Sequence, residues 1–125
     1  MAALSDYAEN AILNHVLGTS AYTFDGSVWL SLHTADPTDA GSGAEVSGGS
    51  YARQAIVFSS ASGTGGSTSN STAEEFTNMP VATVTHIGIW DSVTGGNLLF
   101  HGAVSASKTV ASGDTISVAA AAVTV

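Results

Sequence analysis

The four histidines are the first candidates for metal chemistry, because the chain has no cysteine. They are His15, His33, His86 and His101. No two of them stand at the i, i+2 or i, i+4 spacing that places a pair of ligands on one strand or helix face. We therefore expect half-buried polar side chains, no metal site and no cofactor.

Three acidic residues lie in one glycine-rich loop, at Asp36, Asp39 and Glu45. Their carboxylates could coordinate a hard cation such as Ca²⁺. The order of ligands found in calcium-binding loops is absent, and Asp-Pro-Thr-Asp at residues 36–39 is also an ordinary turn sequence with proline at its second position. The sequence favours the turn and leaves cation binding open.

Hydrolytic chemistry has no specific support in the sequence. Serine is abundant, but none lies in a G-x-S-x-G motif. Glu74 and Glu75 are neighbours whose side chains would point to opposite faces of a strand, so they make a poor acid and base pair. We expect no catalytic residue and no enzymatic activity.

Charge excludes a further class of partner. The chain has ten acidic residues and only two strongly basic ones, Arg53 and Lys108, so the formal charge is −8 and a nucleic-acid backbone would be repelled.

The first 18 residues lack a basic stretch and a long apolar run, so we expect neither a signal peptide nor a membrane anchor. Arg53, the only arginine, should pair with a carboxylate or a backbone carbonyl, either within the chain or across a subunit boundary.

One segment has the periodicity of a helix, over residues 6–17. Ser5 or Asp6 can cap it, and Gly18 can end it. Its apolar stripe consists of Ala8, Ala11, Ile12 and Val16, widened by Leu13 and Leu17. A helix of this length is marginal alone, so the stripe needs a partner surface, either the protein's own sheet or another subunit.

From residue 27 onward the apolar residues alternate with period two, and glycine, proline, asparagine and aspartate mark the turns. The pattern predicts strands at residues 28–34, 55–58, 74–77, 82–91, 97–104, 108–110 and 115–125, with a flexible loop over residues 59–72. The fold class is mainly β, an antiparallel β-sandwich or jelly-roll-like domain with one N-terminal α-helix. We expect a single domain over residues 1–125, with a helical segment at 1–20 and a β-domain at 27–125. The uncharged last strand should pair inside the sheet or be covered by a neighbouring chain.

Several motifs together carry a resemblance to a known family. They are Asp-Tyr at residues 6–7, Leu-His-Thr-Ala-Asp-Pro-Thr at 32–38, Glu-Val-Ser-Gly-Gly-Ser-Tyr-Ala-Arg-Gln at 45–54 and Ile-Gly-Ile-Trp-Asp at 87–91. In these motifs the chain resembles a widespread family of small structural proteins of tailed bacteriophages, commonly described as tail fibre proteins. The resemblance spans most of the chain and implies a protein of the virion, assembled in the host cytoplasm.

Fibres gain length from coiled-coil heptads, collagen-like triplets or repeated β units, and this chain contains none of them. We therefore rank a capsid decoration protein that stabilises the head slightly above a tail fibre or adhesin subunit. Either role implies a homo-oligomer, for which we expect a trimer, bound to the major capsid protein or to tail components. The residues expected at the subunit interface are Tyr7, Ala8, Ala11, Ile12, Val16 and Arg53.

Overall fold

The computed structural model describes residues 2–24 and 26–125. A short strand β1 (Ala3–Leu4) leads directly into the helix α1 (Asp6–Val16). Ser5 caps the helix, since its Oγ accepts a hydrogen bond from the Ala8 backbone N–H at 3.2 Å. Gly18 follows the C-cap with φ of 76°, a left-handed conformation that glycine adopts without steric cost. The predicted helix and both of its end signals are thus confirmed.

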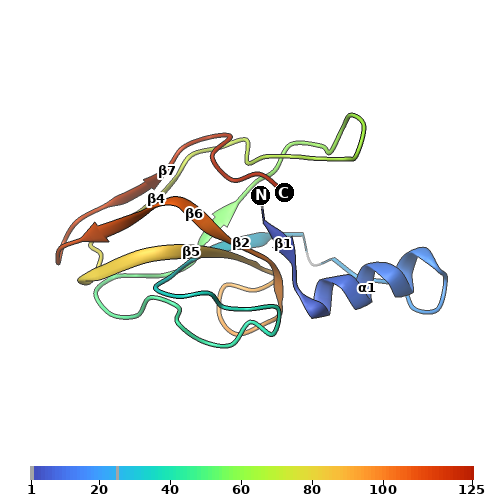
Figure 1. Ribbon diagram of the computed structural model, residues 1–125, viewed down its shortest axis with the longest axis horizontal. Coiled ribbons are helices and arrows are strands. Elements are labelled where there is room, and N and C mark those ends of the chain that lie inside the picture. Colours follow the sequence, from blue (N-terminus) through green and yellow to red (C-terminus); the bar gives the residue numbers. More distant parts are fainter. Residues whose placement is uncertain (1, 25) are drawn as a thin grey trace.

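The strands form two antiparallel sheets. Their bounds are β2 (Val28–His33), β3 (Gln54–Ile56), β4 (Glu74–Phe76), β5 (Ala82–Trp90), β6 (Leu98–Val110) and β7 (Ile116–Val118). Five strands make one sheet in the order β1-β6-β5-β2-β3, and β4 pairs with β7 in a second. Figure 1 shows the β4–β7 pair as a second layer over the larger sheet. The expected mainly β, sandwich-like fold with one N-terminal helix is confirmed.

The centre of the large sheet is the antiparallel pair of β2 and β5, in register from Trp29 opposite Trp90 to His33 opposite His86. The last four residues of β2 are all buried, so side chains on both faces of this strand are covered. The apolar core lies between the two layers. It consists of Leu30, Leu32, Val46, Ile56, Phe76, Met79, Val84, Ile89, Val110, Ile116 and Val123.

Strand β6 differs from the sequence prediction, which divided it into two strands. The small residues Ser105, Ala106 and Ser107 carry no alternating pattern, yet they continue the strand. Opposite them the register with β5 shifts between Val84 and His86, so that β6 bulges relative to its partner. On its other side, β6 pairs with β1 only through Phe100 and His101. Beyond these two residues, no described strand pairs with this edge of β6.

The predicted strand over residues 115–125 is wrong for its second half, because β7 ends at Val118. Asn70 explains the difference. Its Nδ2 donates to the Ala119 carbonyl at 2.9 Å, and its Oδ1 accepts from the Val123 N–H at 2.8 Å. These two backbone groups are therefore hydrogen-bonded to a side chain and not to a neighbouring strand. The predicted loop over residues 59–72 contains no helix or strand, but it is anchored at its end by Asn70, which is almost fully buried.

Candidate functional site

The N-terminus of α1 is fixed to the sheet by backbone contacts. Ser5 is fully buried, its N–H donates to the Leu99 carbonyl at 2.9 Å, and its hydroxyl donates to the Leu98 carbonyl. The Asp6 N–H donates to the Asp39 carbonyl at 3.2 Å. The first turn is therefore held on two sides, by β6 and by the loop after β2.

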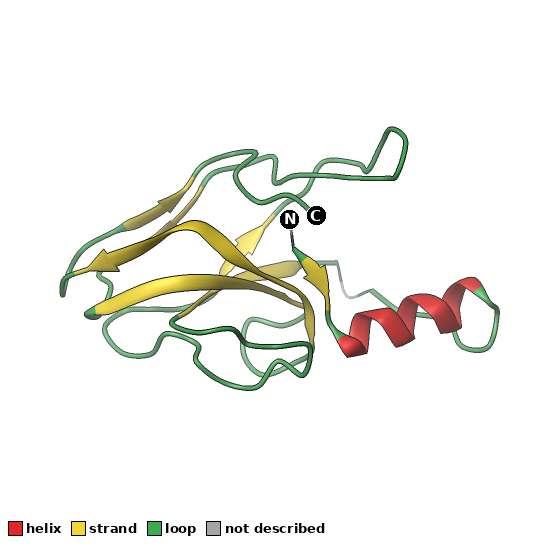
Figure 2. Ribbon diagram, in the orientation of Figure 1, coloured by secondary structure: helices red, strands yellow, loops and turns green. Residues whose placement is uncertain are grey.

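The rest of α1 projects from the sandwich, as Figure 2 shows. Leu13 is 57% exposed, and Val16 and Leu17 are each 72% exposed. Together with Glu9 these residues follow the i, i+4, i+7, i+8 spacing of one helix face. We call Glu9, Leu13, Val16 and Leu17 the outer helix face. Three large apolar side chains gathered on one projecting element are typical of a surface that binds a partner.

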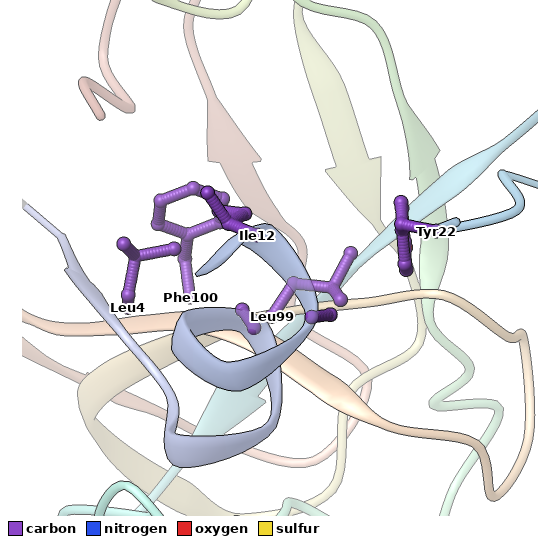
Figure 3. A pocket seen from close by; sticks show the side chains of 7 residues that line it. Leu4, Ile12, Tyr22, Leu99 and Phe100 are labelled. Atoms are coloured by element: carbon purple, nitrogen blue, oxygen red, sulfur yellow. The ribbon is translucent and has the colours of Figure 1, made fainter. Parts of the chain in front are cut away.

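The opposite face of α1 lies on the sheet and leaves a small apolar hollow of about 100 Å³. Figure 3 shows Leu4, Ile12 and Phe100 on one side of it and Tyr22 on the other, with Leu99 below the helix. Such a volume holds little more than a few methyl groups. The hollow is thus a packing defect beneath the helix and is too small for a substrate.

The residues expected at an interface are divided by this geometry. Ala8 is only 5% exposed and packs within the chain, whereas Tyr7 and Ile12 are about half exposed. Val16 is exposed, and Ala11 is intermediate. The N-terminal part of the apolar stripe therefore packs on the protein's own sheet, whereas its C-terminal part is exposed to solvent.

Arg53 lies elsewhere, in a buried polar network. Its Nε and Nη2 donate to the two Glu45 carboxylate oxygens at 2.9 and 2.8 Å, and its Nη1 donates to the carbonyls of Ser92 and Gly95, both at 2.9 Å. The guanidinium carbon stands 3.9 Å from the centre of the Trp90 ring. Arg53 thus joins the loop before β3 to the β5–β6 turn within one chain.

Glu45 also accepts a hydrogen bond from the Tyr51 hydroxyl at 2.9 Å. The Tyr51 hydroxyl oxygen in turn accepts a hydrogen bond from the Leu32 N–H at 3.0 Å. Burial alone would raise the pKa of Glu45, but the hydrogen bonds from Arg53 and Tyr51 outweigh it, so this pKa lies below its ordinary value. Burial is the main reason that the pKa of Tyr51 is raised. Glu45 is therefore held as a carboxylate and Tyr51 as a neutral phenol.

A serine and a histidine lie within hydrogen-bond distance on β2. Ser31 Oγ is 2.8 Å from His33 Nε2, and it also accepts a hydrogen bond from Trp90 Nε1 at 2.8 Å. Both side chains of the pair are buried, at 0% and 1% exposure. Burial lowers the pKa of His33, which favours its neutral form. The pair has the spacing of a nucleophile and base, but the hydroxyl is enclosed by the sheet and a substrate cannot reach it.

The acidic loop residues do not converge on one point. Asp36 and Asp39 flank His101, whose ring nitrogens lie 3.4 and 2.7 Å from their carboxylates, while Glu45 is bound to Arg53. The Asp36 carboxylate also accepts a hydrogen bond from the Thr38 N–H, which lowers its pKa. Across residues 2–24 and 26–125, no group of three or more histidine and acidic side chains is arranged to hold a metal ion.

Sequence reasoning anticipated a carboxylate partner for Arg53 but missed the roles of Ser31, Trp90 and Asn70. No local pattern marks these residues, since each hydrogen-bonds to a segment far away in the chain.

In the described part of the chain, no helix is long and apolar enough to cross a membrane.

Comparison with known proteins agrees with the sequence resemblance. No curated protein matches the chain. The family model of the Podophage GP4 fiber I protein gp80 matches residues 3–125, which is nearly the whole length. The chain therefore belongs to the Podophage GP4 fiber I protein gp80 family and is a virion-associated structural protein of the phage fibre type.

Proposed function

We propose that this protein is a structural subunit of the phage tail fibre and binds neighbouring virion subunits through α1. The observation that carries the proposal is the outer helix face, which extends away from the body of the protein with Leu13, Val16 and Leu17 exposed. The family match supports a fibre role over the capsid decoration role that we ranked first from the sequence. The subunit acts mechanically, as a homo-oligomer attached to tail components, and not as an enzyme.

The polar network around Arg53 supports this proposal. A fibre subunit transmits force between neighbours, so its own body should resist deformation. Among the described residues, no buried side-chain nitrogen or oxygen lacks a hydrogen-bond partner. A fully satisfied buried network favours one rigid arrangement. The body is thus suited to hold the projecting helix in a fixed direction.

The test is to locate the subunit on intact virions by electron microscopy with an antibody label. Labels at the tail support the fibre role, whereas labels spread over the head contradict it. Virions that lack the protein should keep the thermal stability of the head and lose adsorption to cells. A head that opens at lower temperature would instead support the decoration role, because a protein that binds only the assembled shell stabilises that shell.

A further inference from the structure

A second unpartnered surface lies between the two layers of the sandwich. The two sheets are separated along the edges of β6 and β7 by a groove of about 790 Å³. Its lining includes the buried core residues Leu32 and Val84 and the half-buried Ile87, Val104 and Val118. Solvent therefore reaches part of the apolar side chains of Ile87, Val104 and Val118, which a closed sandwich would cover.

Lys108 lies on the β6 wall of this groove and is exposed. Within the described ranges, its side chain makes no hydrogen bond or ion pair. The only other basic residue apart from histidine, Arg53, is bound to Glu45 inside the chain. The groove thus carries the one available strong positive charge of a protein whose formal charge is −8.

The outer helix face has the complementary properties. It is convex where the groove is concave, and it carries Glu9 next to the apolar Leu13, Val16 and Leu17. An amphipathic helix commonly binds an apolar groove through side chains at this spacing. α1 projects at one end of the molecule and β7 lies over the other half of the sandwich, so a chain cannot place its own helix in its own groove (Figure 1).

We infer that the outer helix face of one copy docks into the β6–β7 groove of the next copy, with Glu9 facing Lys108. This inference rests on the proposed fibre role and specifies its self-association. The choice of a second copy follows from charge, because the outer helix face carries Glu9 and the groove carries Lys108, the only lysine of the chain. A contact between two different surfaces closes into a ring or continues as a filament, so a short chain without repeats can build a long structure.

Two double variants test the inference in the full chain. The helix variant, Val16→Gln with Leu17→Gln, removes the apolar knobs at exposed positions. The groove variant, Ala106→Gln with Ala119→Gln, fills the groove from two exposed positions on its walls. Matched controls are Val57→Gln with Val81→Gln and Ala40→Gln with Ala61→Gln, all exposed and outside both surfaces.

Sedimentation at micromolar concentration gives the readout. Wild type and both controls should form trimers or larger assemblies, and each variant alone should sediment as the 12.4 kDa monomer. A mixture of the two variants should restore a 1:1 dimer, because one intact helix then meets one intact groove. A wild type that is monomeric, or that stops at a dimer, overturns the inference, as does a groove variant that assembles normally.

A charge exchange gives a second test. Lys108→Glu and Glu9→Lys should each weaken assembly, and the chain that carries both changes should recover it. If the helix variant assembles while the groove variant does not, another segment occupies the groove and the inference fails. None of these results changes where the protein lies on the virion, so the proposed fibre role is tested separately.

Discussion

The surroundings of Arg53 and those of α1 are opposite in kind. Around Arg53, a charged side chain is buried and meets a carboxylate, two carbonyls and an aromatic ring. At the end of α1, the apolar side chains of Val16 and Leu17 are largely exposed to solvent. The first arrangement stabilises the folded subunit, whereas the second remains available for a partner. Substitutions in the two regions should therefore separate folding from association.

The largest loss of stability should come from Arg53→Met. The variant keeps the length of the side chain but leaves the Glu45 carboxylate without its cation, which typically costs about 3–5 kcal/mol in a buried pair. Urea unfolding followed by circular dichroism measures this change. Arg53→Lys should recover little of the loss, because a lysine cannot donate to both carboxylate oxygens and both carbonyls at once. Full stability in the lysine variant would show that only the charge matters.

Gly88→Ala should have the next largest effect. An added Cβ would stand 2.7 Å from Ser31 Oγ and 2.9 Å from Trp90 Nε1, so it would push apart the hydrogen bond between them. Overpacking of this kind costs about 1–3 kcal/mol. Thermal unfolding measures the loss, and near-ultraviolet circular dichroism should show a changed signal from Trp90. Ser105→Ala is the control, because it adds no atom and lies at an exposed position of β6. An unchanged melting temperature in Gly88→Ala would contradict the close packing described here.

Acid should weaken the fold in two steps. The pKa of His33 lies below its ordinary value of 6.5, so the unfolded chain takes up a proton below pH 6.5 that the folded chain resists, and stability falls as the pH falls. The pKa of Glu45 lies below its ordinary value of 4.5, so its contribution is complete above pH 4.5 and is lost as the pH falls through the lower, folded value. Urea unfolding at a series of pH values measures both steps. His33→Gln should remove the first step and keep the second, and a wild-type curve that is flat from pH 7 to acid would contradict both.

The smallest effect on folding should come from the helix variant, Val16→Gln with Leu17→Gln. Both side chains are exposed, and such surface substitutions usually change the free energy of unfolding by less than about 0.5 kcal/mol. The same variant should lose self-association. A fall in stability as large as that of Arg53→Met would place these residues in the core of the folded subunit.

Local patterns predicted the parts of the fold that depend on neighbours in sequence. The helix, its serine cap and the glycine after it follow from spacing within a few residues, and so does the turn between β5 and β6. Strand β6 was divided because Ser105 and Ser107 interrupt the apolar alternation, although the backbone continues through them. The end of β7 depends on Asn70, a side chain from another part of the chain. The periodicity of residues 115–125 cannot predict this contact, because it depends on a side chain outside that segment.

The candidate site shows the same limit. A carboxylate partner for Arg53 was expected, and Glu45 stands only 8 residues away. The carbonyls of Ser92 and Gly95 are 39 and 42 residues away and meet Arg53 only through the turn of the folded hairpin. The stripe on α1 was evident, but its division into an inner and an outer part depends on how Ser5 orients the helix on β6. The groove between β6 and β7 left no sign in the sequence, because it is formed by the separation of two sheets.

The pairing of β2 with β5 has a consequence for the rate of folding. Trp29 and Trp90 lie opposite one another although about 60 residues separate them, and closing a loop of that length costs about 4 kcal/mol before the contacts compensate for it. Domains dominated by such distant pairings fold in milliseconds to seconds, much more slowly than helical proteins. Trp90 meets Ser31 and Arg53 only when this pairing is complete. Its fluorescence should therefore follow the slow step during refolding, and newly made subunits should become competent to assemble only after that step.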